Sequence, residues 1–199
     1  YEYAFQEPNN YNSLVLLRQK NYLIEQEEIK LEDILDILKN VDIVEEPSDI
    51  PSPQANNFKR VINLCEELMK KDLTKEDIHT NYAFEPRQAD YYVNAGRYLG
   101  LIEKNTVGRI AIYSISNLGR SILKQEYRVR QLSFVKLILS HRAFNDTLKQ
   151  VLNNGGERPS PNEITELMRN ANMRVGSKAV YKRRADSLIS WIKWILDLV

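Results

Sequence analysis

Apolar side chains recur every three to four positions along most of the chain, and this spacing predicts a mainly α-helical protein. Residues 87–102 are the most informative of these segments. As a helix, they place Ala89, Tyr92 and Val93 on one side. The opposite side then carries polar, planar and cationic side chains, Arg87, Gln88, Tyr91, Asn94 and Arg97. Side chains of these types suit the base edges and phosphates of DNA.

A shorter predicted helix precedes this segment. Thr74 is placed to cap it, and Asp77 follows three residues later to complete the capping box. A tight connection at residues 83–85 comes next, and Pro86 suits the first turn of the longer helix. A short helix, a turn and a longer helix in this order predict a helix-turn-helix.

A hairpin is predicted after the longer helix. Apolar, mostly β-branched residues lie on either side of Gly108 within residues 103–116, which indicates two short antiparallel strands. Helices followed by a hairpin are the order of a winged-helix domain. Arg109 would lie on the wing, within reach of a phosphate or of the minor groove.

A second copy of the pattern appears 96 residues later, where Arg183-Arg184-Ala185-Asp186 repeats Arg87-Gln88-Ala89-Asp90. Ser160 to Ile164 matches Thr74 to Ile78 upstream of it. The fold class predicted is therefore mainly α with a small β-hairpin wing, in tandem winged-helix or helix-turn-helix units. We assign Trp191 and Trp194 of the last helix to packing rather than to base stacking.

A proline-rich linker and a division of charge define the predicted domains. Residues 45–53 hold three prolines, so residues 1–52 are interpreted as an acidic N-terminal segment and linker. Residues 53–127 would form the first winged-helix unit and residues 128–199 the second helix-turn-helix unit. Residues 1–52 carry a net charge of −8, whereas the remainder carries +9, of which +7 lies in residues 128–199.

The composition predicts a cytoplasmic protein without a membrane partner. The single cysteine, Cys65, lies in an apolar-periodic segment and is expected to be a small buried residue. One cysteine permits no internal disulfide, which fits a reducing compartment. No signal peptide and no apolar run of membrane-spanning length are visible.

No set of catalytic residues is recognisable in the sequence. We therefore predict no catalytic, metal or cofactor site, and whether the chain is an enzyme is left open. The two histidines, His79 and His141, lie far apart and no paired cysteines accompany them. Glu28 and Lys30 match part of a nuclease motif. We reject that match because the surrounding segment is helix-like and offers no neighbouring strand with another acidic ligand.

Two sets of side chains are the predicted DNA-binding residues. The first comprises Arg87, Gln88, Tyr91, Asn94, Arg97 and Arg109. The second clusters at the start of the last helix and comprises Ser177, Lys178, Tyr181, Lys182, Arg183 and Arg184. Arginine suits guanine and phosphate, glutamine and asparagine suit adenine, and a helix N-terminus favours phosphate. An ordinary surface role is the alternative, in which Arg87 pairs with Asp90 or Glu85.

Two segments resemble a known family. The first is Phe84-x-x-Arg87-Gln88-Ala89-Asp90-Tyr91-Tyr92-x-Asn94-Ala95-x-Arg97-Tyr98-Leu99-Gly100-Leu101-Ile102, and the second is residues 183–195. Both resemble winged-helix modules of bacterial restriction–modification proteins, of the type II restriction endonuclease-like kind. The resemblance covers residues 56–199. It implies that the chain recognises DNA beside a nuclease, and that a parent enzyme would be a restriction endonuclease. Residues 1–55 match no nuclease signature, so the nuclease domain or subunit would lie outside this chain.

The predicted function is therefore double-stranded DNA binding, sequence-directed, as the recognition part of a restriction or related defence protein. The main alternative is a protein–protein interaction or homodimerisation module, in which the face bearing Trp191 and Trp194 docks another domain. A third reading, in which the chain itself is a nuclease, would require Mg²⁺-dependent cleavage of plasmid DNA.

Overall fold

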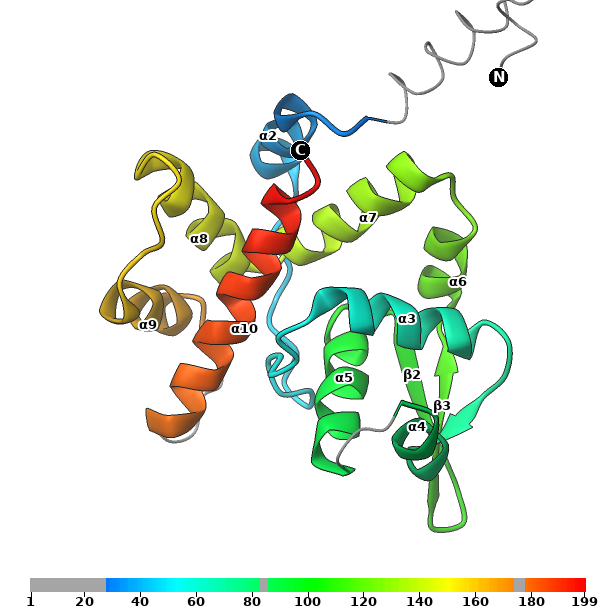
Figure 1. The fold of residues 1–199 in the computed structure, drawn as a ribbon. Helices are drawn as coiled ribbons and strands as arrows, with labels where there is room; N and C mark the ends of the chain where they lie inside the picture. Colours follow the sequence, from blue (N-terminus) through cyan, green and yellow to red (C-terminus); the bar gives the residue numbers. More distant parts are fainter. Residues whose placement is uncertain (1–27, 83–85, 174–177) are drawn as a thin grey trace, which may run out of the picture.

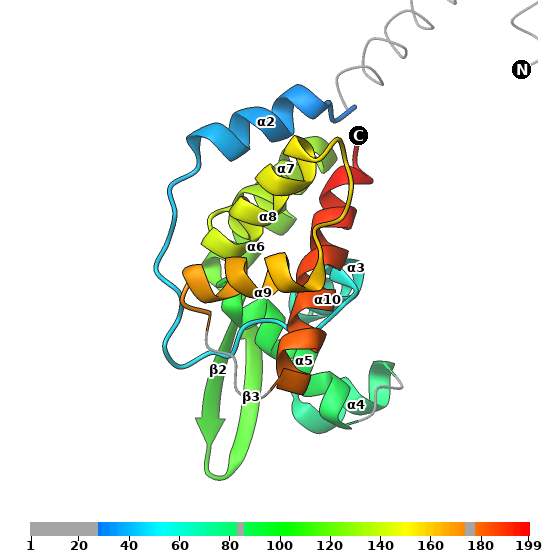
Figure 2. The same ribbon diagram turned by 90° about the vertical axis from the view of Figure 1, so that its left-hand side faces the viewer.

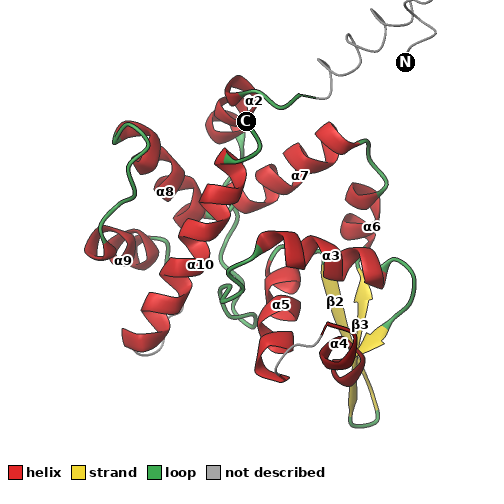
Figure 3. Cartoon of the chain, in the orientation of Figure 1, coloured by secondary structure: helices red, strands yellow, loops and turns green. Residues whose placement is uncertain are grey.

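The computed structural model describes residues 28–82, 86–173 and 178–199. Figure 1 shows the elements in chain order: α2 (Leu31–Asn40), α3 (Phe58–Leu68), β1 (Leu73–Thr74), α4 (Lys75–Tyr82), α5 (Pro86–Tyr98), β2 (Ile102–Val107), β3 (Ile110–Ile115), α6 (Asn117–Leu123), α7 (Tyr127–Leu139), α8 (Arg142–Asn153), α9 (Pro161–Asn170) and α10 (Lys178–Leu196). The described chain is mainly helical with one small sheet (Figure 3), which confirms this coarse prediction. The predicted connection at residues 83–85 and residues 1–27 of the predicted N-terminal segment fall outside the described residues.

The sheet is three-stranded and antiparallel, in the order β1-β3-β2. The predicted hairpin is confirmed, because β2 pairs with β3 from Ile102–Ile115 to Val107–Ile110. The pairing of Leu73 with Tyr113 adds β1, a strand that the sequence did not predict. Two residues are too short for a recognisable alternation, so only the long-range pairing identifies this strand.

Local capping confirms the predicted start of α4 and marks the start of α9. The backbone N–H and the hydroxyl of Thr74 both donate to Asp77 Oδ2, at 2.8 Å and 2.6 Å, ahead of α4. Ser160 and Glu163 form the corresponding capping box of α9. The hydrogen bonds of Asp77 and Glu163 lower the pKa of each carboxyl, because they stabilise its charged form.

The apolar core runs without interruption across α3, α7, α8 and α10. The ring of Phe58 lies 4.9 Å from that of Trp191, 4.4 Å from that of Trp194 and 5.8 Å from that of Phe134. Trp191 Nε1 also donates a 2.8 Å hydrogen bond to the backbone oxygen of Ala55. The predicted packing role of both tryptophans is confirmed. Trp191 is 0% exposed and Trp194 only 7%, so neither ring is itself open to a docking partner, while the alternative of a protein-interaction module stays a prediction.

The helix α10 crosses the middle of the molecule (Figure 1), with α8 and α9 on one side and α3 and α5 on the other. Within the described residues, no helix is both long and apolar enough to cross a membrane.

The segment that joins α2 to α3 is held against the helices by polar contacts. The Tyr98 hydroxyl donates a 2.6 Å hydrogen bond to Glu46 Oε2, and His141 Nδ1 lies 3.3 Å from Glu46 Oε1. The rings of Tyr98 and His141 stack at 4.0 Å, and the N–H of Val44 donates to the oxygen of Ser140. These contacts attach the predicted linker to the core, while the predicted domain limits themselves stay predictions.

Cys65 is buried in α3, as predicted, and its environment has a consequence at high pH. Burial, with a smaller contribution from the charge of Glu66, raises the pKa of this thiol from 9.0 to about 12. Above pH 9 the unfolded chain releases the proton while the folded chain retains it. The free energy of unfolding should therefore fall between pH 9 and 12, by about 1.4 kcal/mol per pH unit for this group.

Urea titrations of the wild type and of Cys65→Ala across this pH range measure the effect. We expect Cys65→Ala to be less stable near neutral pH, because it leaves a cavity, but to lose less stability as the pH rises. The remaining alkaline loss should include Tyr98, whose pKa is raised by burial and then by the carboxylate of Glu46. Parallel pH profiles for the two proteins would contradict the assignment to Cys65.

Candidate nucleic-acid interface

The buried face of α5 fixes which of its side chains reach solvent. Ala89, Tyr92 and Val93 are buried, as their helical spacing predicted. Gly96 allows the helix to approach β2 closely, since a Cβ at this position would lie 2.4 Å from Cδ1 of Ile102. The outward side carries all five predicted residues: Arg87 and Gln88 are exposed, and Tyr91, Asn94 and Arg97 are half-buried.

Contacts within the outward face leave a cationic and planar surface. The guanidinium of Arg87 lies 5.8 Å from the centre of the Tyr91 ring, a cation–π arrangement. Arg97 Nη1 donates a 3.2 Å hydrogen bond to Oδ1 of Asn94. The Asp90 carboxylate forms a salt bridge with Lys75 at 2.6 Å. Among the described residues, Arg87 forms no ion pair with Asp90, and Glu85 lies outside them.

The first half of α10 provides the second predicted set. Lys182 and Arg183 are exposed and Tyr181 is half-buried. Ser177 and the side chain of Lys178 lie outside what the structure describes. Among the described residues of the predicted set, this half of α10 therefore offers two adjacent exposed cations, Lys182 and Arg183.

Arg184 departs from the predicted pattern, because only 7% of it is exposed. Its Nε and Nη1 have no hydrogen-bond partner among the described residues. Burial lowers the pKa of this guanidinium, although the nearby Tyr181 and Tyr98 act in the opposite direction. Arg184 shares a helix face with Ser187, Leu188 and Trp191, which are all buried at i+3, i+4 and i+7. The prediction that Arg184 belongs to the exposed set is therefore wrong.

The outward faces of α5 and α10 meet at a small hollow. Its volume is about 210 Å³, and its lining includes Gln88 and Tyr91 from α5 together with Arg183 from α10. Gln54 and Asn56, from the segment before α3, and Asp186 of α10 also contribute to the polar lining. The structure thus brings predicted residues of both units to one place. Gln54 and Asn56 could not be found from the sequence, because they lie in a segment without periodicity.

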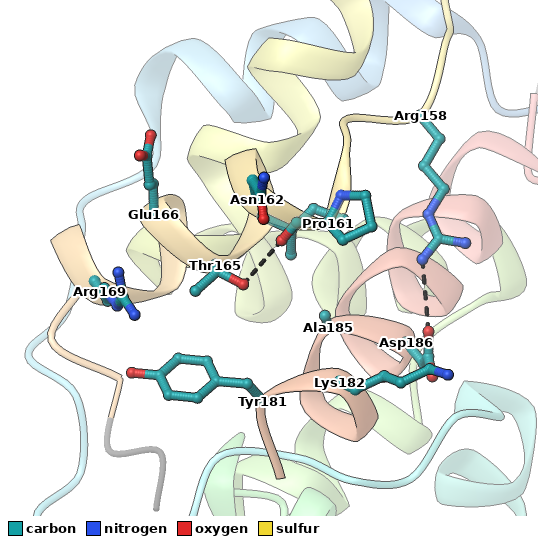
Figure 4. A pocket seen from close by; sticks show the side chains of 11 residues that line it. Arg158, Pro161, Asn162, Thr165, Glu166, Arg169, Tyr181, Lys182, Ala185 and Asp186 are labelled. Atoms are coloured by element: carbon teal, nitrogen blue, oxygen red, sulfur yellow. Dashed lines mark hydrogen bonds and ion pairs between the residues drawn. The ribbon is translucent and has the colours of Figure 1, made fainter. Parts of the chain in front are cut away.

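A larger hollow of about 810 Å³ lies between α9 and α10 (Figure 4). Arg158 Nη2 contacts Asp186 Oδ1 at 3.5 Å, and the guanidinium of Arg169 lies 5.7 Å from the ring centre of Tyr181. Lys182 adds a third cation to the lining. Arg158 and Arg169 were not among the predicted residues, because neither belongs to the repeated motif that identified the site.

Arg109 occupies the turn between β2 and β3 and is exposed. In Figure 1 the tip of this hairpin lies at the lower right of the molecule, the N-terminal end of α10 at the lower left and the N-terminal end of α5 between them. We define the candidate interface as this lower end of the molecule, with Arg87, Gln88, Arg109, Lys182 and Arg183 as its exposed members.

The comparisons with known proteins identify one family. Its description is a domain of unknown function (DUF7226), and it matches residues 60–199, which is more than two thirds of the chain. Neither the curated proteins nor the solved structures contain a match to the chain.

Proposed function

The chain belongs to the DUF7226 family, and we propose that it is a double-stranded DNA-binding protein that uses α5 and α10 as recognition helices. The observation that carries this proposal is the convergence of Gln88 and Tyr91 from α5 with Arg183 from α10 around one hollow. Arg87 and Lys182 are exposed beside them on the same two helices. Two helices that present such side chains together can contact one duplex.

The arrangement of elements supports a winged-helix unit followed by a helix-turn-helix unit. In the first, α3, α4 and α5 precede the β2–β3 hairpin, and β1 adds to the sheet. In the second, α8, α9 and α10 pack against one another. In a helix-turn-helix, the second helix enters the major groove and its N-terminal residues contact base edges. In the proposed complex, base contact would fall to Arg87 and Gln88 of α5 and to Arg183 of α10.

The chemistry of these residues divides between sequence reading and positioning. Arginine can contact guanine in a bidentate manner, and glutamine can do the same with adenine, so Arg87 and Gln88 suit base edges. Lys182 and Arg109 are exposed cations that suit phosphate oxygens, which position the protein without reading sequence. The net charge of +9 on residues 53–199 favours association with a polyanion.

The proposal extends to a role as the recognition part of a restriction or related defence protein. Its support is the resemblance of residues 84–102 and 183–195 to modules of restriction–modification proteins. In this role the nuclease would be a separate domain or subunit, and this chain would supply the target specificity.

Fluorescence anisotropy with a random-sequence duplex of about 30 base pairs, titrated at several salt concentrations, tests the proposal. We expect affinity whose logarithm falls linearly with the logarithm of salt, because binding releases counterions from the DNA. The double variant Arg87→Ala/Arg183→Ala should bind at least about tenfold more weakly. Each phosphate contact that it loses should reduce the steepness of the salt dependence by about 0.9.

The matched control is Lys39→Ala/Lys193→Ala, which removes two exposed cations from α2 and from the C-terminal end of α10. In Figure 1, α2 and the C-terminal end of α10 lie at the upper end of the molecule, opposite the candidate interface, so affinity should change little. Equal losses in the two double variants would show that only overall charge matters. Absence of binding even at low salt would refute DNA binding and leave a protein partner as the alternative.

A further inference from the structure

The tip of the β2–β3 hairpin carries the two most exposed large apolar side chains of the described residues. Val107 is 64% exposed and Ile110 58%. They are opposite partners in the strand register. Directly opposite residues of an antiparallel pair project to the same face, so Val107 and Ile110 form one apolar ridge.

The hairpin holds this ridge away from the core. Only two residues, Gly108 and Arg109, connect the strands, and Gly108 has a φ of +62°, which suits the first central position of a type II′ turn. From Glu103 to Val107, every residue of β2 is exposed. Both ribbon views show the tip projecting beyond the helices (Figures 1 and 2). The ridge therefore contributes little to the core of the chain.

The charge around the ridge indicates what it contacts. Arg109 lies in the turn between the two apolar residues and is exposed. The tip also lies at the same end as the N-terminal ends of α5 and α10 (Figure 1). An apolar side chain beside an arginine suits the minor groove, where the arginine is attracted by the negative potential and the apolar group contacts stacked bases.

We propose that Val107 and Ile110 form an apolar wedge that enters the minor groove, partly unstacks one base step and bends the duplex. This inference rests on the proposed DNA binding and specifies what the hairpin does in the complex. Apolar side chains that enter base steps in this way bend DNA by on the order of 20–90°. The expected bend therefore distinguishes a wedge from a hairpin that only contacts phosphates.

Two measurements on the full chain test the wedge. Anisotropy reports affinity, and ligase-catalysed circularisation of a linear duplex of about 150 base pairs reports bending, because this length is close to the persistence length of DNA. The wild type should accelerate circularisation. The variant Val107→Ser/Ile110→Ser should bind roughly tenfold more weakly and lose the acceleration, since it no longer offers apolar surface to the bases.

Two controls separate the wedge from charge and from general surface effects. Arg109→Ala should weaken binding and its salt dependence but retain most of the acceleration. Val129→Ser changes a residue of α7 that is 50% exposed, and it should leave both measurements unchanged. Thermal melting checks that each variant is folded. We expect all of them to fold, because Val107, Arg109, Ile110 and Val129 are all exposed.

Each remaining outcome overturns the wedge in a recognisable way. A wild type that binds the duplex without accelerating circularisation refutes the wedge and leaves DNA binding intact. A serine double variant that still accelerates circularisation does the same. If sedimentation instead shows a dimer that this variant disrupts, the ridge is a contact between two copies of the chain. Absence of duplex binding by anisotropy refutes both the wedge and the proposed function.

Discussion

Replacement of Trp191 by alanine is expected to lower the free energy of unfolding by about 3–5 kcal/mol. The indole is fully buried and packs against Phe58 and Phe144, at ring distances of 4.9 Å and 5.2 Å. Its removal would leave a cavity and would also leave the oxygen of Ala55 without its 2.8 Å hydrogen bond. Chemical denaturation followed by circular dichroism measures the change.

The location of Trp191 also predicts how the chain unfolds. Its side chain contacts α3 and the segment before α3. These lie before the predicted boundary at residue 128, whereas α10 itself lies after it. The helices of both predicted units should therefore lose stability together, in one transition, in both the wild type and Trp191→Ala. A matched control is Tyr127→Ala, because Tyr127 is 51% exposed and its loss should cost little.

Two outcomes would contradict this expectation. A loss of less than about 1 kcal/mol in Trp191→Ala would mean that the cavity closes or that the indole is not a core residue. Two separate transitions, of which Trp191→Ala shifts only one, would show that the predicted units fold independently despite their shared core.

The elements that the sequence predicted are those whose signals are local. The apolar spacing of Ala89, Tyr92 and Val93 places the buried face of α5 correctly. Side-chain caps such as Thr74 act within three residues, so the start of α4 was also predictable. The hairpin follows from Gly108 and its β-branched neighbours. In each case the interaction partners lie within one turn or one hairpin of one another.

The features that the sequence did not predict depend on contacts between distant residues. The hydrogen bond of Tyr98 to Glu46 joins residues 52 positions apart, and no periodicity encodes it. The meeting of Gln88 with Arg183 around one hollow is equally remote in sequence. The repeated motif indicated two similar helices, but it carried no information on whether they lie side by side.

The position of Arg184 is different, because a local signal was present. Trp191 was correctly predicted to be a packing residue, and Arg184 precedes it by seven residues, and the buried Leu188 by four, on the same face. Its charge favoured an exposed interpretation over this spacing. The structure shows that the spacing was the better guide and that the burial leaves part of the guanidinium unsatisfied among the described residues.

The neighbours Arg183 and Arg184 should therefore respond to substitution in opposite ways. Arg183 is exposed beside the hollow between α5 and α10, so Arg183→Glu should lower affinity for the duplex by roughly 5–150-fold and leave stability nearly unchanged. Arg184 carries a buried charge, so Arg184→Met should raise the free energy of unfolding by about 1 kcal/mol or more. The affinity of the Arg184→Met variant for the duplex should equal that of the wild type.

Methionine suits the second test because its unbranched side chain can fill the space of the arginine stem without a charge. Arg184→Glu is the complementary control: it buries a carboxylate instead and should be strongly destabilised. Denaturation and anisotropy measured on the same three variants separate the two roles. If Arg184→Met were to lose duplex affinity at unchanged stability, Arg184 would have to reach the DNA. The contribution of α10 to the interface would then extend beyond its exposed face.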